Sequence, residues 1–307
     1  VNPLRALLHL PSRYRIWVLQ RRLDAAMGEV VRARVAELRS AANGATPRRD
    51  ILSLAIRHEI ERASHSEMGN EAISDVADQL KTFFFAGHDT TSTLIAWAVW
   101  LLAANSAACA RVREEAEACL GGWVAHCGFV RNASDDACGE ASSKAGGAVN
   151  SNAPEAKAPT YEALQRCEFL DAVLRETLRL YPPGGSARLA PDDETFGGWG
   201  IGGCIIYISH YVLHRRPELW DSPEDFRPER FLGTEVDPFV YQPFSRGARD
   251  CIGKYFAMLE AKLAVVALVT KFDFEVVNAK ETLKMMVTQR PMHGAKVRVF
   301  YRGGRAR

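Results

Sequence analysis

The stretch Phe244-Ser-Arg-Gly-Ala-Arg-Asp-Cys251-Ile-Gly253 is followed directly by the apolar segment Lys254-Tyr-Phe-Ala-Met-Leu-Glu-Ala-Lys-Leu263. We call residues 244–253 the cysteine loop. Its glycines and charges predict irregular backbone, and the apolar segment predicts a helix that begins just after Cys251. At such a place the free amides and the positive end of the helix dipole favour a thiolate over a thiol. The loop is therefore a candidate site for thiolate chemistry.

Other residues of the loop suggest a bulky partner. Gly247 and Gly253 let the backbone come close to a large group, and Arg249 can face an acid group on it. The alternative is that Cys251 is simply a buried core residue, as cysteines often are. The loop by itself leaves both interpretations open, so the rest of the chain has to decide between them.

Composition limits the class of protein. Of the 307 residues, 47% are apolar, and the net charge of +2 gives no special attraction to nucleic acid. The seven cysteines include no CxxC pair, which predicts reduced thiols rather than a secreted disulfide framework. No apolar run reaches the ~18 residues that a membrane span needs. We expect a soluble chain or a piece of a longer protein.

Apolar spacing predicts three helices before the loop, over residues 14–39, 50–62 and 71–104. The third is interrupted by a patch of polar and small residues, Ala86-Gly-His-Asp-Thr-Thr-Ser-Thr93. The plain interpretation is a tolerated kink, since Gly87 weakens a helix and hydroxyls can bond back to its carbonyls. The functional interpretation is an oxygen-binding notch, in which Asp89 and Thr90 supply protons.

The middle of the chain predicts an insertion. Residues 121–159 are rich in Gly, Ala, Ser and Asn, and we expect them to be disordered. This part of the chain also contains residue types that can bind zinc, but their spacing fits no structural zinc pattern. We therefore do not predict a zinc site from Cys119, His126, Cys127 and Cys138.

After the insertion, Thr160 can cap a helix that runs to Leu180 and stops at Pro182. Glu176 and Arg179 lie three residues apart on one face of this helix and can pair. Their leucine neighbours predict that the pair is largely buried, where it needs further partners to be stable.

The last third of the chain predicts short strands. Residues 184–214 are rich in glycine and β-branched residues, and two more strands are expected around Phe272–Val277 and Val297–Tyr301. Gly198–Gly203 fits the pattern GxGxxG, but no helix of a βαβ unit follows, so we reject a dinucleotide site. The predicted fold class is mainly α with small β-sheets.

Four motifs resemble those of the cytochrome P-450 family of haem-thiolate monooxygenases, and they occur in the family's order. They are AGHDTT at 86–91, ETLR at 176–179, PERF at 228–231 and FSRGARDCIG at 244–253. The last matches the family pattern Phe-x-x-Gly-x-Arg-x-Cys-x-Gly at all of its fixed positions. The resemblance implies the cytochrome P-450 fold, incomplete at the N-terminus, and a membrane connection only through a missing N-terminal segment. Residues 1–307 are then the C-terminal part of a single haem-binding catalytic domain.

The resemblance also implies roles for individual residues. Cys251 is expected to ligate the haem iron, and Asp89 and Thr90 to relay protons to bound oxygen. Further haem contacts are expected from Phe244, Gly247, Arg249, Gly253, Arg188 and His214, the last two at the propionates. A structural triad that steadies the cysteine loop is expected from Glu176, Arg179 and Arg230. The substrate pocket is expected to include Phe84, Phe85, Ala86, Gly185 and Ser186.

The implied function is a monooxygenase that carries haem b, activates O2, and hydroxylates or epoxidises a small apolar substrate. Its electrons are expected from NADPH through a reductase, or through a ferredoxin. The expected location is the cytosolic face of the endoplasmic reticulum membrane, with the plastid as alternative. Two other functions stay open: a haem-thiolate isomerase that rearranges peroxides without reductant, and a truncated, non-catalytic chain that cannot hold haem.

Overall fold

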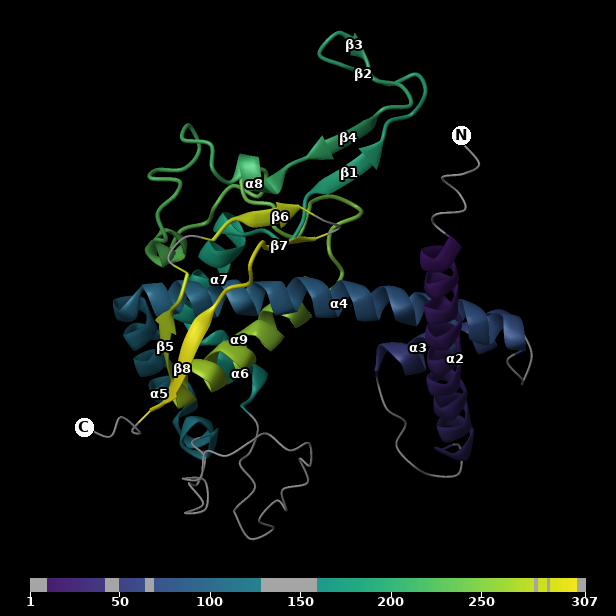
Figure 1. Ribbon diagram of the computed structural model, residues 1–307, viewed down its shortest axis with the longest axis horizontal. Helices are drawn as coiled ribbons and strands as arrows, with labels where there is room; N and C mark the ends of the chain where they lie inside the picture. The colour runs from purple at the N-terminus through teal and green to yellow at the C-terminus, as the bar shows by residue number, and fades with distance from the viewer. Residues whose placement is uncertain are drawn as a thin grey trace. The chain divides into compact units, whose positions relative to one another are not determined.

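The computed structural model describes residues 10–41, 50–63, 69–127, 159–278, 281–285 and 288–302. The chain divides into two compact units, Val1–His88 and Asp89–Arg307, each of which is described by itself. Helix α4 (Asn70–Ala104) contributes residues to both. The described chain is mainly helical with small two-stranded sheets (Figure 1), which confirms the predicted fold class.

The first unit contains α2 (Leu10–Ala41), α3 (Ile51–Ala63) and the first part of α4. The three helices that the apolar spacing predicts are therefore present. Val31 of α2 and Ile56 of α3 are completely buried and pack with Val76 of α4 in one cluster. Because these side chains recur at helical spacing, each helix turns one apolar stripe to the others.

The second unit is built around a larger apolar core. Its further helices are α5 (Ser106–Cys127), α6 (Tyr161–Gln165), α7 (Glu168–Leu180), α8 (His210–Leu213), the 3-10 helix η1 (Pro228–Phe231) and α9 (Lys254–Lys271). Leu102 of α4, Val112 of α5, Leu174 of α7 and Val265 of α9 are fully buried together. This core fixes the position of α9, the helix that follows Cys251.

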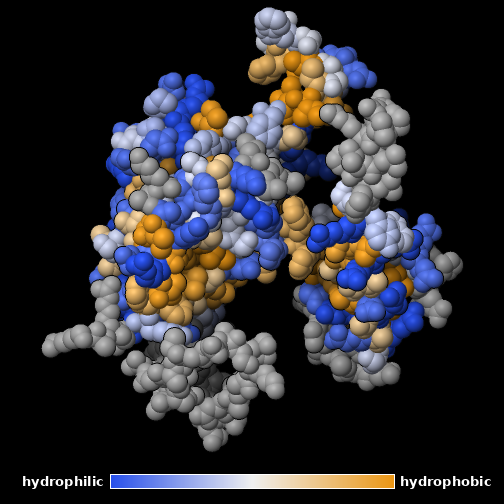
Figure 2. Space-filling view, viewed as in Figure 1, coloured by the Kyte–Doolittle hydropathy of each residue, from blue (hydrophilic) through white to orange (hydrophobic). Residues whose placement is uncertain are grey.

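Four antiparallel strand pairs complete this unit. They are β1 (Ser186–Leu189) with β4 (Ile205–Ile208), β2 (Thr195–Phe196) with β3 (Trp199–Gly200), β5 (Phe272–Val276) with β8 (Val297–Tyr301), and β6 (Leu283–Met285) with β7 (Gln289–Pro291). The strands predicted near residues 272–277 and 297–301 are β5 and β8. Exposed apolar side chains, among them Leu189, Phe196, Trp199 and Ile205, gather on the β1–β4 hairpin and its tip (Figure 2).

Two sequence predictions about helix limits are wrong. The expected helix from Thr160 to Leu180 is two helices, because α6 ends at Gln165 and α7 begins at Glu168. The carboxylate of Glu115 accepts hydrogen bonds from the first free amides of α7, at Phe169 (2.7 Å) and Leu170 (2.8 Å). A cap that comes from another helix leaves no local signal in the sequence.

The expectation of disorder from residue 121 onward is wrong for the first seven residues. Residues 121–127 belong to α5, which departs from helical geometry at Leu120 and then continues to Cys127. The Gly, Ala and Ser content that suggested disorder at 121 is compatible with a helix end. Residues 128–158 lie outside the described part of the chain.

No single described helix is both long and apolar enough to cross a membrane, although α4 and α5, bent by 114° at their junction, meet the length and composition criteria as a pair.

Candidate functional site

The cysteine loop ends where α9 begins. Gly253 is the N-cap residue of α9, and Lys254 is its first residue. The loop closes on itself through a hydrogen bond from the Cys251 amide to the Phe244 carbonyl at 2.9 Å. Gly247 has a φ of +89°, a conformation that side chains other than glycine adopt with strain. The backbone therefore holds Cys251 at the start of a helix, as the composition predicts.

The Cys251 side chain is exposed, unlike Cys109 and Cys167, which are buried. The alternative of a buried core cysteine therefore does not hold. Apolar side chains that follow Cys251 closely in the sequence are also exposed: Ile252 at 86% and Phe256 at 69%. An open thiol within exposed apolar surface suits a large planar apolar group, which would cover that surface and accept the sulfur as a ligand.

Two of the expected haem-contacting arginines are available as cations. Arg249 is exposed in the loop, and Arg188 is exposed on β1, where its guanidinium donates only locally, to the Ala187 carbonyl at 2.8 Å. Among the described residues, no group of three or more His, Cys, Asp or Glu side chains could hold a metal ion. A single thiolate fits a metal that brings its other ligands with it, as haem iron does.

Glu176 and Arg179 of α7 are completely buried and form two parallel hydrogen bonds of 2.8 Å. The Arg230 Nε donates to the same Glu176 carboxylate at 3.1 Å, and so does the Arg227 amide at 2.9 Å. The structure thus brings the three residues of the expected triad into one network. Four donor contacts on one buried carboxylate replace the water that it loses on burial.

Arg179 extends this network beyond α7. Its guanidinium also donates to the carbonyls of His214 (2.9 Å), Pro223 (2.6 Å) and Asp225 (3.0 Å). A buried charge whose donors are all used is far less costly than an unpaired one. The network therefore fixes the irregular segment from 214 to 230 against α7.

His214 is not placed where a propionate contact requires it. The side chain is fully buried, and its Nε2 accepts a hydrogen bond from the Gln242 amide at 2.9 Å. The ring packs among His210, Trp220 and Tyr241. Because the ring has no exposed surface, the expected contact with a haem carboxylate is wrong. His214 instead contacts the segment that leads into the cysteine loop.

The buried His214 predicts an acid-dependent loss of stability. Burial lowers the pKa of His214 to about 3, whereas an unfolded histidine has a pKa of about 6.5. As the pH falls below 6.5, the unfolded chain binds a proton that the folded chain excludes. This residue then removes about 1.4 kcal/mol from the free energy of unfolding per pH unit, down to about pH 3. Near pH 7 it is neutral in both states and has no such effect.

Chemical unfolding at pH 7, 6 and 5 measures this slope. The control is His214→Gln, whose amide oxygen can accept from the Gln242 amide but takes up no proton. The variant should lose stability less steeply than the parent between pH 6.5 and pH 5. Equal slopes would contradict the assignment.

Asp89 lies in α4 and is nearly buried, with 6% of its surface exposed. Its carboxylate is contacted by the Thr288 hydroxyl and the Arg290 guanidinium, both from the region of β7. Its main-chain carbonyl accepts the hydroxyl of Thr93 at 2.8 Å, a local bond that satisfies the helix in this polar patch. Thr90, partly buried, follows Asp89 in the same helix. Sequence analysis missed Thr288 and Arg290, which lie about two hundred positions further along the chain.

The expected substrate-pocket residues fall in both units. In the first unit, Phe84 and Phe85 are exposed on α4, and Phe84 stacks on His88 with ring centroids 5.9 Å apart. Ala86 is exposed beside them. In the second unit, a Cβ added to Gly185 would meet the Tyr207 Oη at 2.4 Å and the Ile208 carbonyl at 2.7 Å. Gly185 therefore packs against β4 and tolerates no side chain.

Ser186 does not act as an open pocket residue. It is buried, and its Oγ bonds the Ser245 Oγ at 2.8 Å and the His210 Nε2 at 3.1 Å. The hydroxyl thus bonds two partners inside the protein. The expectation that Ser186 lines the substrate pocket is wrong, because its side chain connects β1 to the cysteine loop.

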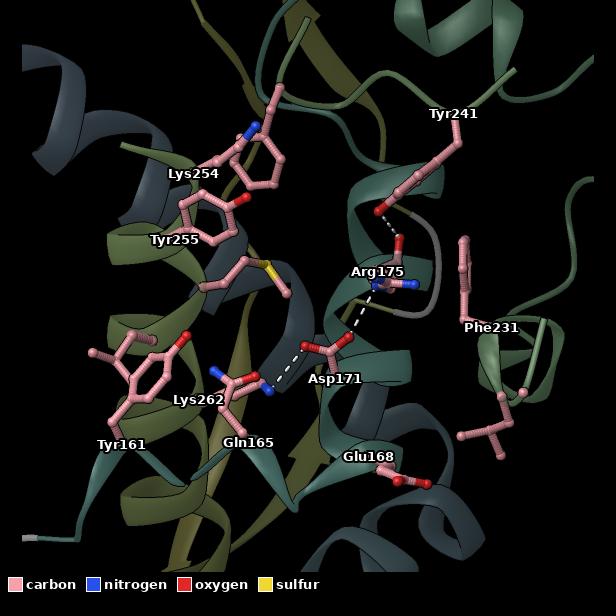
Figure 3. A pocket seen from close by; sticks show the side chains of 15 residues that line it. Tyr161, Gln165, Glu168, Asp171, Arg175, Phe231, Tyr241, Lys254, Tyr255 and Lys262 are labelled. Atoms are coloured by element: carbon pink, nitrogen blue, oxygen red, sulfur yellow. Dashed lines mark hydrogen bonds and ion pairs between the residues drawn. The ribbon is translucent and has the colours of Figure 1, made fainter. Parts of the chain in front are cut away.

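A cavity of about 530 Å³ lies between α7 and α9 (Figure 3). Asp171 of α7 spans it by pairing with Lys262 of α9 and with Arg175, each at 2.9 Å. Phe244 and Lys254, at the two ends of the cysteine loop, line the cavity, whereas Cys251 does not. The cavity therefore lies beside the loop and is separate from the face that presents the thiol.

Comparison with known proteins agrees with these features. The family model for cytochrome P450 matches residues 2–125 and 142–296. Cytochrome P450 3A2 of Rattus norvegicus is 34% identical over 226 residues, which cover 71% of this chain and 38% of the relative. Human cytochrome P450 3A5 is 32% identical over 243 residues, 76% of this chain and 40% of the relative.

Cytochrome P450 3A19 of Capra hircus aegagrus is 33% identical over 213 residues, 68% of this chain and 82% of the relative. The chain spans about two fifths of the length of the rat and human relatives. The unmatched residues 126–141 fall within the predicted insertion. Since the family model covers most of the chain, including all four motifs, this chain belongs to the cytochrome P450 family.

Proposed function

We propose that this chain binds haem b through Cys251 and carries the ligand loop and proton-relay residues of a haem-thiolate monooxygenase. The reaction would hydroxylate or epoxidise a small apolar substrate, with electrons from NADPH through a reductase or a ferredoxin. The observation that carries the proposal is the exposed Cys251 thiol at the start of α9, within exposed apolar surface. Membership of the cytochrome P450 family supports it.

The residues of the loop suit this ligand. Cys251 Sγ, at the start of α9, would ligate the haem iron. Gly247 and Gly253 leave room for close approach, since no atom lies within 4 Å of a Cβ built at Gly247. Arg249 and Arg188 would neutralise the propionates. When bound, haem supplies the iron at which O2 is held and activated.

Asp89 and Thr90 would deliver protons. The Asp89 carboxylate lies below the surface, but its partner Arg290 has 49% of its side chain exposed. Arg290 thus connects the buried carboxylate to the solvent. Asp89 can exchange a proton with solvent along this connection, and the neighbouring Thr90 hydroxyl can pass it on. The Thr288 hydroxyl keeps the carboxylate oriented.

The test of the proposal is the absorption spectrum of the reduced, carbon-monoxide-treated protein. A strongly red-shifted Soret band is expected for a thiolate ligand. A band at the position of a neutral ligand, or no haem band, would contradict Cys251 ligation in this chain. Turnover of a peroxide substrate without any reductant would favour the isomerase alternative over monooxygenation.

Removing the proton-relay groups should separate oxygen use from product formation. In Thr90→Ala and Asp89→Asn, loss of a general acid is expected to lower product formation by about 10²-fold or more. NADPH consumption should fall less, with the difference appearing as hydrogen peroxide. The control is Ser92→Ala, whose hydroxyl bonds only the Asp89 carbonyl, at 3.2 Å. Unchanged coupling in both relay variants would contradict the proposed roles.

For the whole protein we propose a location at the cytosolic face of the endoplasmic reticulum membrane. The similarity to vertebrate 3A cytochromes supports this location over the plastid. Fractionation of cells that express the full-length protein tests it.

A further inference from the structure

Two histidines one helical turn apart are linked by hydrogen bonds to Gln242 and Ser245, at the start of the cysteine loop. His210 is the first residue of α8, and His214 is its C-cap residue. Both are buried, and their rings stack with centroids 5.9 Å apart. Burial lowers the pKa of both, so that they are neutral at physiological pH. A neutral ring can serve as a hydrogen-bond acceptor or donor without the cost of a buried charge.

Each ring is connected to the start of the loop through different hydrogen bonds. His214 accepts from the Gln242 amide at 2.9 Å. His210 acts through Ser186, whose Oγ lies 3.1 Å from its Nε2 and donates to the Ser245 Oγ at 2.8 Å. Gln242 and Ser245 are themselves joined, by a 3.1 Å bond from the Ser245 amide to the Gln242 carbonyl. One turn of backbone is therefore fixed at both ends.

This turn contains a residue of strained backbone, Ser245, next to Phe244, the residue that closes the loop. Ser245 has a φ of +63°, which costs free energy in a residue other than glycine or asparagine. Phe244, its neighbour, accepts the Cys251 amide at 2.9 Å. Side-chain hydrogen bonds that over-determine a strained residue are what keep it in place. The position of the Cys251 backbone therefore depends on the bonds at residues 242 and 245.

We propose that His210 and His214, with Ser186 and Ser245 as the link, are positioning residues that set the orientation of Cys251 toward the haem iron. The proposal rests on the proposed haem ligation. The two histidines are buried and would act at a distance from the thiol, through the Gln242 amide and the Ser186–Ser245 link. They connect α8 and the β1 strand to the loop. Changes in this link should therefore weaken the bond between the Cys251 thiolate and the haem iron without preventing the protein from folding.

The experiment compares Ser186→Ala with Ser209→Ala in the haem-loaded protein. Ser209 caps the same helix α8, with its Oγ accepting the Val212 amide at 3.4 Å, and its side chain takes no part in the hydrogen bonds at residues 242 and 245 described above. In the reduced carbon monoxide complex, some of the haem can carry a neutral ligand in place of the thiolate. We expect this fraction to be severalfold larger in Ser186→Ala than in Ser209→Ala, while the two variants have equal stability. Ser186→Thr, which retains the hydroxyl, should restore the parent spectrum. Identical spectra for Ser186→Ala and Ser209→Ala would overturn the proposal.

Hydrogen exchange gives a second readout that does not need haem ligation. Amides at residues 242–251 should exchange about tenfold faster in Ser186→Ala than in Ser209→Ala, the scale of one lost hydrogen bond. If the parent shows no thiolate band but this difference appears, the proposed function fails while the link to the loop stands. If exchange is equal in the two variants, the link itself is wrong.

Discussion

Cys251→Ala is expected to abolish the red-shifted Soret band of the reduced carbon monoxide complex completely. Cys251 is the residue that we propose as the ligand, and the described residues contain no group of three or more His, Cys, Asp or Glu side chains that could hold a metal instead. An alanine leaves no donor that could replace it. Haem that still associates through the apolar surface of Ile252 and Phe256 would be bound weakly and would show the spectrum of a neutral ligand or of water. Haem content after gel filtration should therefore fall as well.

The matched control is Cys204→Ala. Cys204 is also exposed and also precedes a regular element, since β4 begins at Ile205. Its loss removes an accessible thiol of the same kind without touching the cysteine loop. The control should keep the parent spectrum and haem content. A thiolate band that survives in Cys251→Ala, or that disappears in Cys204→Ala, would assign the ligand to another cysteine.

The sequence was most informative where neighbouring positions interact. Helix limits in the first unit follow from apolar spacing, and the Glu176–Arg179 pair follows from a three-residue separation on one helix face. The start of α9 after Cys251 follows from two glycines and the apolar segment behind them. Each of these features is local, so a pattern of a few residues contains it.

The features that the sequence could not predict all join distant segments. The carboxylate of Glu115 caps a helix more than fifty positions away, and Arg290 reaches Asp89 from the other end of the unit. For His214 the short motif led to a wrong prediction. A motif resemblance suggested an exposed role near haem, whereas packing against Trp220 and Tyr241 buries the ring completely. Burial depends on which elements meet, and that information is not present in a short motif.

Glu176→Gln is expected to reduce the free energy of unfolding by about 3–5 kcal/mol, the cost of leaving a buried charge without its partner. Arg179 stays fully buried, and its three carbonyl acceptors do not compensate its positive charge. The variant also weakens the contact with Arg230, so the segment from 214 to 230 loses its attachment to α7. Because that segment leads to the cysteine loop, haem retention should fall together with stability.

Urea unfolding of Glu176→Gln beside Glu275→Gln measures the effect. Glu275 pairs with Arg298 at 3.0 Å on the surface, where both side chains are more than half exposed. Water screens such a pair, and its loss should cost less than about 1 kcal/mol. The double variant Glu176→Gln with Arg179→Met removes both buried charges and should recover part of the lost stability, since the unpaired cation is gone. Equal losses in Glu176→Gln and Glu275→Gln, or a double variant that is no more stable than Glu176→Gln, would show that charge pairing is not what stabilises this network.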